Sequence, residues 1–211
     1  GIKGASQLIE SDLKNNSTLS ELTQLITIES DRIISLLDRM EHISNNNLKL
    51  ECEYINIHEI LNHCRRVAQN SFGAQVVYID DYDPSLPKLF ANKNLLIQII
   101  LNLLKNSSEA SSINGKIKIK TSFNSNKITS FSKEDSPTTL PLQIEVIDYG
   151  IGIPSHMLPN IFDPFISSKK DGKGLGLSIV ASGLEEMSAV INVSSEPGFT
   201  NFCINFPLIK Q

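Results

Sequence analysis

The sequence predicts an α+β protein in which a helical hairpin precedes a mixed β-sheet with helices on one side. Two observations support this fold class. Apolar residues near the start of the chain follow a heptad pattern, and after residue 52 the pattern changes to alternating strand-like and helix-like segments. We therefore expect two domains, at residues 1–46 and 53–211.

The first domain is predicted to be an antiparallel pair of helices. Residues 1–13 place their apolar side chains on one helical face, and the polar stretch KNNST then interrupts the pattern. In the next helix, apolar residues recur at steps of three and four from Leu19 to Ile43, with Glu29 as the one polar member. This seam fits a coiled-coil spacer or half of a dimeric bundle, and periodicity leaves both open.

The second domain is predicted from period-two alternation in its strands and from amphipathic or apolar patterns in its helices. A polar stretch at residues 124–139 is expected to form an exposed loop or a hairpin. The expected strands span residues 52–57, 74–80, 115–123, 140–148, 189–195 and 200–208, and the expected helices span residues 58–72, 92–111 and 174–187.

Composition excludes several classes of protein. The net charge is −4 with no large basic block, which argues against a nucleic-acid or anionic-membrane surface. No apolar run approaches the ~20 residues of a membrane span. Three cysteines without CxxC pairing indicate reduced, buried thiols in a cytosolic protein. We therefore expect a cytoplasmic protein that binds neither nucleic acid nor membrane.

The predicted helix at residues 92–111 is mostly apolar but carries a polar stripe. The stripe recurs at three- and four-residue spacing, which places its members on one face of the helix. Its members are Gln98, Asn102, Lys105, Asn106 and Glu109.

An acidic, glycine-containing loop, DYGIGIP, runs from Asp148 to Pro154 directly after a predicted strand. One interpretation is a tight turn that uses glycine for positive φ. The alternative is a binding loop, in which Gly150 and Gly152 let a planar base approach the backbone while Asp148 accepts a hydrogen bond from it.

Two further glycine loops follow. In DGKGLGLSIV, Gly172, Gly174 and Gly176 lead into a helix, which suits phosphate because bare N–H groups meet the positive end of the helix dipole. In EPGFTNF, Gly198 turns the chain and Thr200 offers a hydroxyl. Neither a Walker loop nor a dinucleotide-binding fingerprint is present.

Taken in order, the asparagine helix, DYGIGIP, IFDPFISSKK, GKGLGLS and PGFTNF resemble the ATP-binding domain of sensor histidine kinases. That domain belongs to the superfamily of gyrase, Hsp90 and MutL. The resemblance covers residues 53–208 and implies a Bergerat-type α/β sandwich. The hairpin resembles the dimerisation and phosphotransfer domain of these kinases. GIKGASQLIE, DPSLP and FDPFISSKKDGKGLGLSIV resemble the nitrogen-regulation kinases of the NtrB type.

The resemblance implies ATP and Mg²⁺ as ligands. Asn106 would ligate the Mg²⁺ that bridges the phosphates, Asn102 would contact phosphate or a metal-bound water, and Lys105 would supply charge. Asp148 would hold the adenine amino group above Gly150 and Gly152.

The remaining implied positions surround the triphosphate and the base. Thr200 would line the far side of the adenine pocket. Phe162 and Phe165 would anchor the lid, although plain core packing explains them nearly as well. Tyr149, where the family commonly has a small polar residue, would sit at the pocket mouth. The lid itself would comprise Gly172, Gly174, Leu175, Gly176 and Leu177.

The resemblance also implies that the chain begins just after the phosphoacceptor histidine box, so the acceptor is expected to be absent. In the family, the phosphoryl group passes to an aspartate of an NtrC-type response regulator, a PII protein controls the balance of activities, and the full-length protein is a homodimer. The histidines of the chain lack the context of an acceptor; they are His42, His58, His63 and His156.

The choice between kinase and ATPase depends on Asn102. Hydrolysing relatives carry at this position a glutamate that activates water, and general-base help is worth on the order of 10²–10⁴ in rate. An amide cannot act as that base, so the sequence favours phosphoryl transfer. The alternatives are an ATPase of the gyrase or MutL kind and a degenerate nucleotide-binding interaction module.

Overall fold

The computed structural model describes residue 26 and residues 52–124, 128–129, 138–169 and 174–207. The chain divides between Leu50 and Glu51 into two compact units, and the second unit holds all of the described residues except Ile26. The helical hairpin predicted for residues 1–46 lies outside the described residues apart from Ile26, so it stays a prediction.

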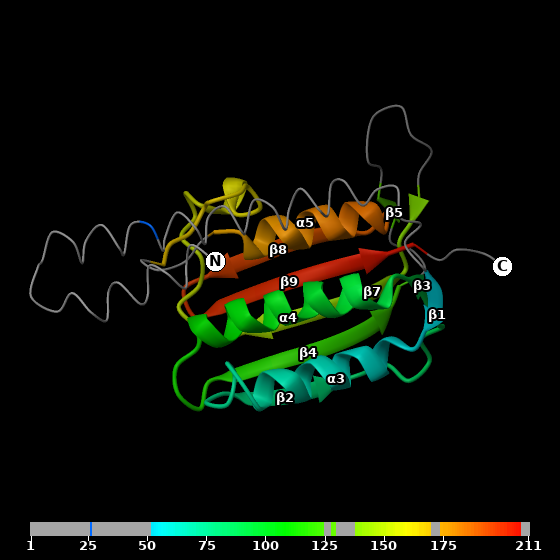
Figure 1. Ribbon diagram of the computed structural model, residues 1–211, viewed down its shortest axis with the longest axis horizontal. Coiled ribbons are helices and arrows are strands. Elements are labelled where there is room, and N and C mark those ends of the chain that lie inside the picture. The colour runs from blue at the N-terminus through cyan, green and yellow to red at the C-terminus, as the bar shows by residue number, and fades with distance from the viewer. Residues whose placement is uncertain (1–25, 27–51, 125–127, 130–137, 170–173, 208–211) are drawn as a thin grey trace, which may run out of the picture. The chain divides into compact units, whose positions relative to one another are not determined.

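A five-stranded mixed sheet forms the frame of the second unit (Figure 1). β2 runs parallel to β4, and every other neighbouring pair is antiparallel. The prediction of a mixed sheet is therefore confirmed. The strands in spatial order are β2 (Val77–Asp81), β4 (Lys116–Phe123), β7 (Leu142–Asp148), β9 (Phe199–Phe206) and β8 (Val190–Glu196).

Three helices cover one face of this sheet, as the sequence predicts (Figure 1). They are α3 (Ile57–Gln69), α4 (Lys93–Ala110) and α5 (Gly176–Glu186). Asn92 caps the start of the central helix α4: its side chain accepts a hydrogen bond from the Leu95 N–H at 2.9 Å and so satisfies one free donor of the first turn.

The core lies between these helices and the sheet. α4 contributes fully buried Leu and Ile side chains, and burying each one is worth about 1.5–3 kcal/mol. Alternate residues of β4 and β7 pack against these side chains, because successive side chains of a strand point to opposite faces of the sheet. The main contributors are Leu96, Ile99, Ile100, Leu103, Leu104, Ile117, Ile119, Ile144 and Val146.

Smaller elements complete the described part. β1 (Glu53–Ile55) and β3 (Leu89–Ala91) form an antiparallel pair, and β3 was not predicted because three residues are too few to show alternation. The start of β2 was misplaced by three residues. Within the polar stretch, β5 (Ile128–Thr129) pairs with β6 (Thr138–Thr139), which favours the hairpin alternative. η2 is a short 3₁₀ turn at Leu158–Asn160.

The cysteines correct one expectation. Cys64 and Cys203 are buried, as predicted, but Cys52 is exposed. Cys52 directly precedes the short strand β1.

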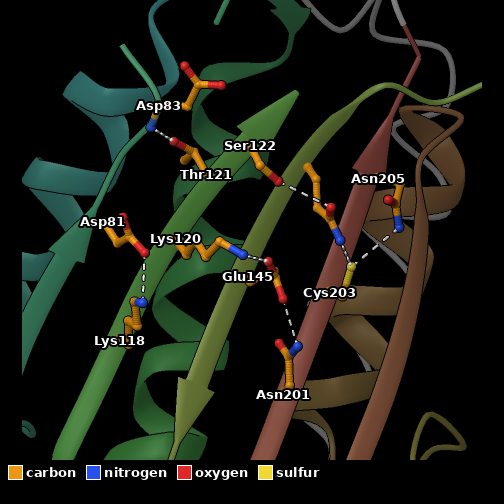
Figure 2. Close-up of polar contacts among 11 residues, drawn as sticks. Asp81, Asp83, Lys118, Lys120, Thr121, Ser122, Glu145, Asn201, Cys203 and Asn205 are labelled. Atoms are coloured by element: carbon orange, nitrogen blue, oxygen red, sulfur yellow. Dashed lines mark hydrogen bonds and ion pairs between the residues drawn. The ribbon is translucent and has the colours of Figure 1, made fainter. Parts of the chain in front are cut away.

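The face of the sheet away from the helices, which we call the outer face, is polar (Figure 2). Lys120 Nζ lies 3.0 Å from Glu145 Oε1, and Asn201 Nδ2 donates to Glu145 Oε2 at 2.8 Å. Lys118 Nζ lies 2.7 Å from Asp81 Oδ2. Polar side chains on these strands thus pair with one another across the ladder, as is common on the face of an antiparallel sheet away from its helices.

Candidate nucleotide-binding site

Asp148 and Thr200 lie side by side at one end of the sheet, on the helix-covered face. They are direct partners in the β7–β9 register, and Thr200 is in turn the partner of Ser195 on β8. Asp148 is 1% exposed and Thr200 is 2% exposed. The structure therefore brings Asp148, predicted to hold the adenine amino group, next to Thr200, predicted to line the adenine pocket. Ser195, Thr200 and Asp148 form one row across β8, β9 and β7.

Burial of Asp148 raises the pKa of its carboxyl group above the ordinary value. Three groups act in the opposite direction: the backbone N–H of Gly150, the hydroxyl of Ser107 and the charge of Lys169. The Gly150 N–H donates to Asp148 Oδ1 at 3.1 Å. Asp148 is thus a buried carboxyl group with accepting capacity beyond its local contacts.

The glycines after Asp148 are required by close backbone contacts. A Cβ on Gly150 would clash with the carbonyl group of Ala110, coming within 2.7 Å of its carbon. Gly152 has φ +76°, and a Cβ there would clash with the backbone of Glu196. The loop therefore packs closely between the end of α4 and the β8–β9 turn, which supports both the turn and the binding interpretations.

Asn102 and Asn106 converge on the start of α5. A Cβ on Gly176, the first residue of α5, would lie 3.7 Å from Asn102 Oδ1 and 3.8 Å from Asn106 Nδ2. The N-cap residue Leu175 makes no side-chain cap hydrogen bond. The first N–H groups of α5 thus have no side-chain acceptor from the cap and lie close to the two amides, an arrangement suited to an anion.

The lid residues are only partly described. Gly172 lies outside the described residues. Gly174 has φ +64°, and its carbonyl accepts a hydrogen bond at 2.9 Å from the N–H of Phe165, which itself has φ 68°. Leu175 and Leu177 are half-buried, and Leu177 packs on the core.

The two lid phenylalanines differ. Phe162 is partly buried and packs against the core, which matches the core-packing alternative. Phe165 is 50% exposed and holds a positive φ, which is unfavourable for a residue with a Cβ. Core packing does not explain a strained, exposed aromatic residue beside Gly174, and the lid role of Phe165 stays a prediction.

A small charged cluster lies at the end of α4. Glu109 forms ion pairs with Lys105, at 4.0 Å, and with Lys169. Lys169 belongs to the segment just before the glycine lid, so this cluster connects that segment to α4. The sequence assigns Glu109 no role and does not single out Lys169, because a contact between residues 60 positions apart leaves no local pattern.

Ser107 and Ser195 were also not predicted. The position of Ser195 could have been inferred from the short EPGF turn, since a hairpin closed by Glu196 and Phe199 places Ser195 opposite Thr200.

Tyr149 does not take the predicted place at the pocket mouth. Its ring packs 6.2 Å from that of Phe199, which alternates with Thr200 and so belongs to the opposite face of the sheet.

Residues 91–210 match the family described as histidine kinase-, DNA gyrase B- and HSP90-like ATPase. The chain belongs to this ATPase family. The match contains Asn106, Asp148, the described lid glycines and Thr200, so the residues brought together here lie within the ATP-binding domain of the family.

Relatives of this ATPase family extend the similarity beyond the domain. The chain is 40% identical over 212 aligned residues to a sensory histidine kinase/phosphatase NtrB of Azospirillum brasilense, covering 100% of this chain and 52% of the relative. A second NtrB, from Rhodobacter capsulatus, is also 40% identical, with 58% of its length covered. The chain thus spans a little over half the length of these relatives.

Solved structures of histidine kinases share the fold. Full-length ShkA, crystallised in complex with AMPPNP, gives a TM-score of 0.67 at 20% identity, covering 98% of this chain and 42% of that one. The resemblance to NtrB-type kinases and the α+β fold class are both confirmed.

The described residues suit a magnesium-bound triphosphate by the chemistry of their donors. No group of three or more His, Cys, Asp or Glu side chains gathers as a metal cage in the described part of the chain. Mg²⁺ does not need such a cage, because it keeps several waters and takes one or two protein oxygens together with substrate phosphates. The neighbouring amides of Asn102 and Asn106 fit that requirement.

No helix among the described residues has the length and hydropathy of a membrane span.

Proposed function

We propose that this chain is the ATP-binding catalytic part of a nitrogen-regulation sensor histidine kinase. The whole protein transfers the γ-phosphoryl group of ATP first to a histidine and then to an aspartate of an NtrC-type response regulator. A PII protein regulates it, and it acts as a cytoplasmic homodimer. The observation that carries the proposal is the convergence of the Asn102–Asn106 pair, the start of α5 and the Asp148–Thr200 row in one domain of the ATPase family.

The chain's own residues would divide the nucleotide between them. The Asp148 carboxylate accepts a hydrogen bond from the adenine amino group, and Thr200, the register partner of Asp148 rather than a residue of the far side, lines the same edge of the base. Gly150 and Gly152 keep the loop close enough to contact the ring. Burial strengthens these contacts, because fixed groups in a low-dielectric site need little reorganisation.

The phosphate end lies at α4 and α5. The amide oxygen of Asn106 is the proposed Mg²⁺ ligand, and Asn102 contacts a phosphate oxygen or a metal-bound water. The backbone N–H groups of Gly176 and Leu177 donate to phosphate oxygens, and Lys105 adds positive charge. When bound, Mg²⁺ neutralises charge on the phosphates and orients them.

Phosphoryl transfer is favoured over hydrolysis by the same geometry. Asn102 faces Gly176 from one turn before Asn106, where hydrolysing relatives carry the general-base glutamate. An amide there holds the nucleotide without activating water, so the intrinsic ATPase rate is expected to be low.

Calorimetric titration of the chain with ATP and Mg²⁺ tests the proposal. We expect Asn106→Ala to remove most of the Mg²⁺-dependent part of the affinity for ATP. The loss should be roughly 100-fold, because residues that only support a metal ligand already contribute up to that much to metal affinity. Gln98→Ala, earlier on the same polar stripe, is the matched control and should bind like the wild type. Unchanged affinity in Asn106→Ala would remove Asn106 from the site, and no binding by the wild type would overturn the proposal.

A further inference from the structure

We propose that Ser195 is a positioning residue that directs the Thr200 hydroxyl proton away from the base pocket, so that the pocket selects a purine with an amino group at position 6. This inference rests on the proposed binding of ATP beside Asp148 and Thr200. It assigns the selectivity to a residue that touches neither the phosphates nor the metal ion.

The Ser195 hydroxyl makes three hydrogen-bond contacts. The backbone N–H of Ile153, in the loop that follows Asp148, donates to Ser195 Oγ at 2.8 Å. Ser195 Oγ lies 3.1 Å from the carbonyl oxygen of Phe199 and 2.9 Å from Thr200 Oγ1. One small side chain therefore joins the Asp148 loop, the β8–β9 turn and the base pocket.

Counting protons fixes the direction of these bonds. A hydroxyl group donates one proton and accepts at its lone pairs. The Ile153 N–H can only donate, and the Phe199 carbonyl can only accept. If the Ser195 proton goes to Phe199, the contact with Thr200 is a hydrogen bond only when Thr200 donates. This is the one arrangement that satisfies all three contacts at once.

The consequence for Thr200 is that its proton points to Ser195 and only its lone pairs remain for a ligand. Asp148, its partner in the next strand, is likewise an acceptor when ionised. The row from β9 to β7 thus offers acceptors to the edge of the base. A 6-amino purine supplies N–H donors to such a row, whereas a 6-oxo purine presents a carbonyl oxygen that no group in the row can satisfy.

The surroundings keep Ser195 in this geometry. Ser195 and Thr200 are direct partners in the β8–β9 ladder, which fixes the separation of their side chains. The neighbouring Gly152 packs without a Cβ against the backbone of Glu196, the next residue after Ser195. The loop and the turn can therefore hold their positions even where the Ser195 hydroxyl is removed, which makes the substitution informative.

The experiment compares ATP with inosine triphosphate (ITP), which differs from ATP only in carrying the 6-oxo form of the base. Dissociation constants of both nucleotides are measured with Mg²⁺ for the full chain of residues 1–211. In Ser195→Ala, the Thr200 proton is released and can turn toward a 6-oxo group. The ratio of the ITP to the ATP dissociation constant is then expected to fall by a factor of roughly 2–10, the worth of one hydrogen bond.

Two controls separate selectivity from folding. Ser195→Thr keeps the hydroxyl and should retain the wild-type ratio. Ser194→Ala removes a hydroxyl from the opposite face of the same strand, where Ser194 is exposed, and should change neither constant. Thermal unfolding of each variant shows whether it is folded. If Ser195→Ala does not fold, Thr200→Val, which removes the Thr200 hydroxyl itself from the pocket, should lower the ratio instead.

A fall in both affinities with an unchanged ratio would overturn the inference and leave Ser195 with a purely structural role. A ratio that is also unchanged in Thr200→Val would remove the whole row from base selection. Failure of the wild type to bind ATP is a separate result, since it overturns the proposed function itself.

Discussion

Two acidic residues of the same strand, Asp148 and Glu145, lie on opposite faces of the sheet and have different surroundings. Glu145 is on the outer face, where Lys120 and Asn201 bind its two carboxylate oxygens (Figure 2). Asp148 is buried under the helices and forms no ion pair within the described part of the chain; its one close backbone donor is Gly150.

The difference indicates which carboxyl group serves the fold and which is available to a ligand. Glu145 has its accepting capacity used by protein partners, so it stabilises the sheet. Asp148 is buried with capacity to spare, an arrangement that disfavours its ionised form and that proteins keep where a ligand supplies the missing donor. Substitutions on the two faces should therefore separate nucleotide affinity from stability.

The largest effect is expected for Asp148→Asn. The variant keeps an oxygen for the Gly150 N–H but lacks the charge, so ATP affinity should fall by roughly 10- to 150-fold, as expected for a hydrogen bond to a charged group. Stability should not fall with it. The pKa of Asp148 is higher in the folded state than in the unfolded state. Ionisation of this carboxyl group therefore destabilises the folded protein, and the effect develops as pH rises from the unfolded pKa to the folded pKa.

Above the folded pKa that opposition is complete, and there the asparagine variant should unfold at the same or a higher temperature than the wild type. The advantage should disappear in acid, where the carboxyl group is protonated in both states. Calorimetry with ATP and thermal unfolding between pH 3 and pH 7 measure the two effects. Loss of affinity together with a large loss of stability would contradict the comparison, because Asp148 would then be structural.

A smaller effect, on stability rather than on ATP affinity, is expected for Glu145→Ala on the outer face. Lys120 and Asn201 lose their common partner, so the free energy of unfolding should fall by about 1–3 kcal/mol. ATP affinity should stay that of the wild type. Denaturant titration measures the first quantity and calorimetry the second. Glu145→Gln is the matched control, since it can keep the bond from Asn201 and should lose less. A drop in ATP affinity as large as that of Asp148→Asn would show that the outer face also serves nucleotide binding and would contradict the comparison.

The smallest effect is expected at His58, on the helix-covered side but away from the nucleotide site. Its Nε2 lies 3.0 Å from Thr121 Oγ1, and its ring stacks on Tyr82 with centroids 4.9 Å apart. Burial lowers the pKa of His58 below 6.5, and the nearby charge of Asp83 opposes this shift. The neutral ring therefore stabilises the fold above the unfolded pKa, and this contribution is lost as pH falls through the lower folded value.

His58→Phe keeps the stacking on Tyr82 but loses the hydrogen bond to Thr121. At pH 8 the variant should be less stable by about 0.5–1.5 kcal/mol, and the difference from the wild type should shrink toward pH 5. Denaturant titrations across that range provide the measurement, and ATP affinity should not change. A difference that grows on acidification would show that the charged ring is the stabilising form. A change in ATP affinity would show that burial under the helices, rather than position near Asp148, decides function.

Much of the site could be predicted because its residues lie in short local motifs. The polar stripe on α4 follows from helical spacing, so Asn102 and Asn106 could be placed on one face without a structure. Gly152 and Gly174 hold the positive φ values that glycine loops favour. Alternation in the segment that forms β4 predicted one wet face, and Lys118 and Lys120 of β4 form their ion pairs on the outer face.

The contacts between distant segments could not be predicted in the same way. The partnership of Glu109 with Lys169 and the hydrogen bonds of Ser195 to both Ile153 and Thr200 depend on how loops meet across the sheet. Tyr149 was misplaced for a related reason. A residue just past the end of a strand has no periodic pattern to assign its face, and only the packing against Phe199 decided it.

The sequence by itself determined the fold class, the helix that carries the asparagines and the loops that carry the glycines, because each depends on periodicity or backbone conformation within about 20 residues. Tertiary structure alone decided which acidic residue of β7 is left with unused accepting capacity. Asp148 and Glu145 differ by three positions on one strand, and the side of the sheet that each faces determines whether protein or ligand completes its hydrogen bonds.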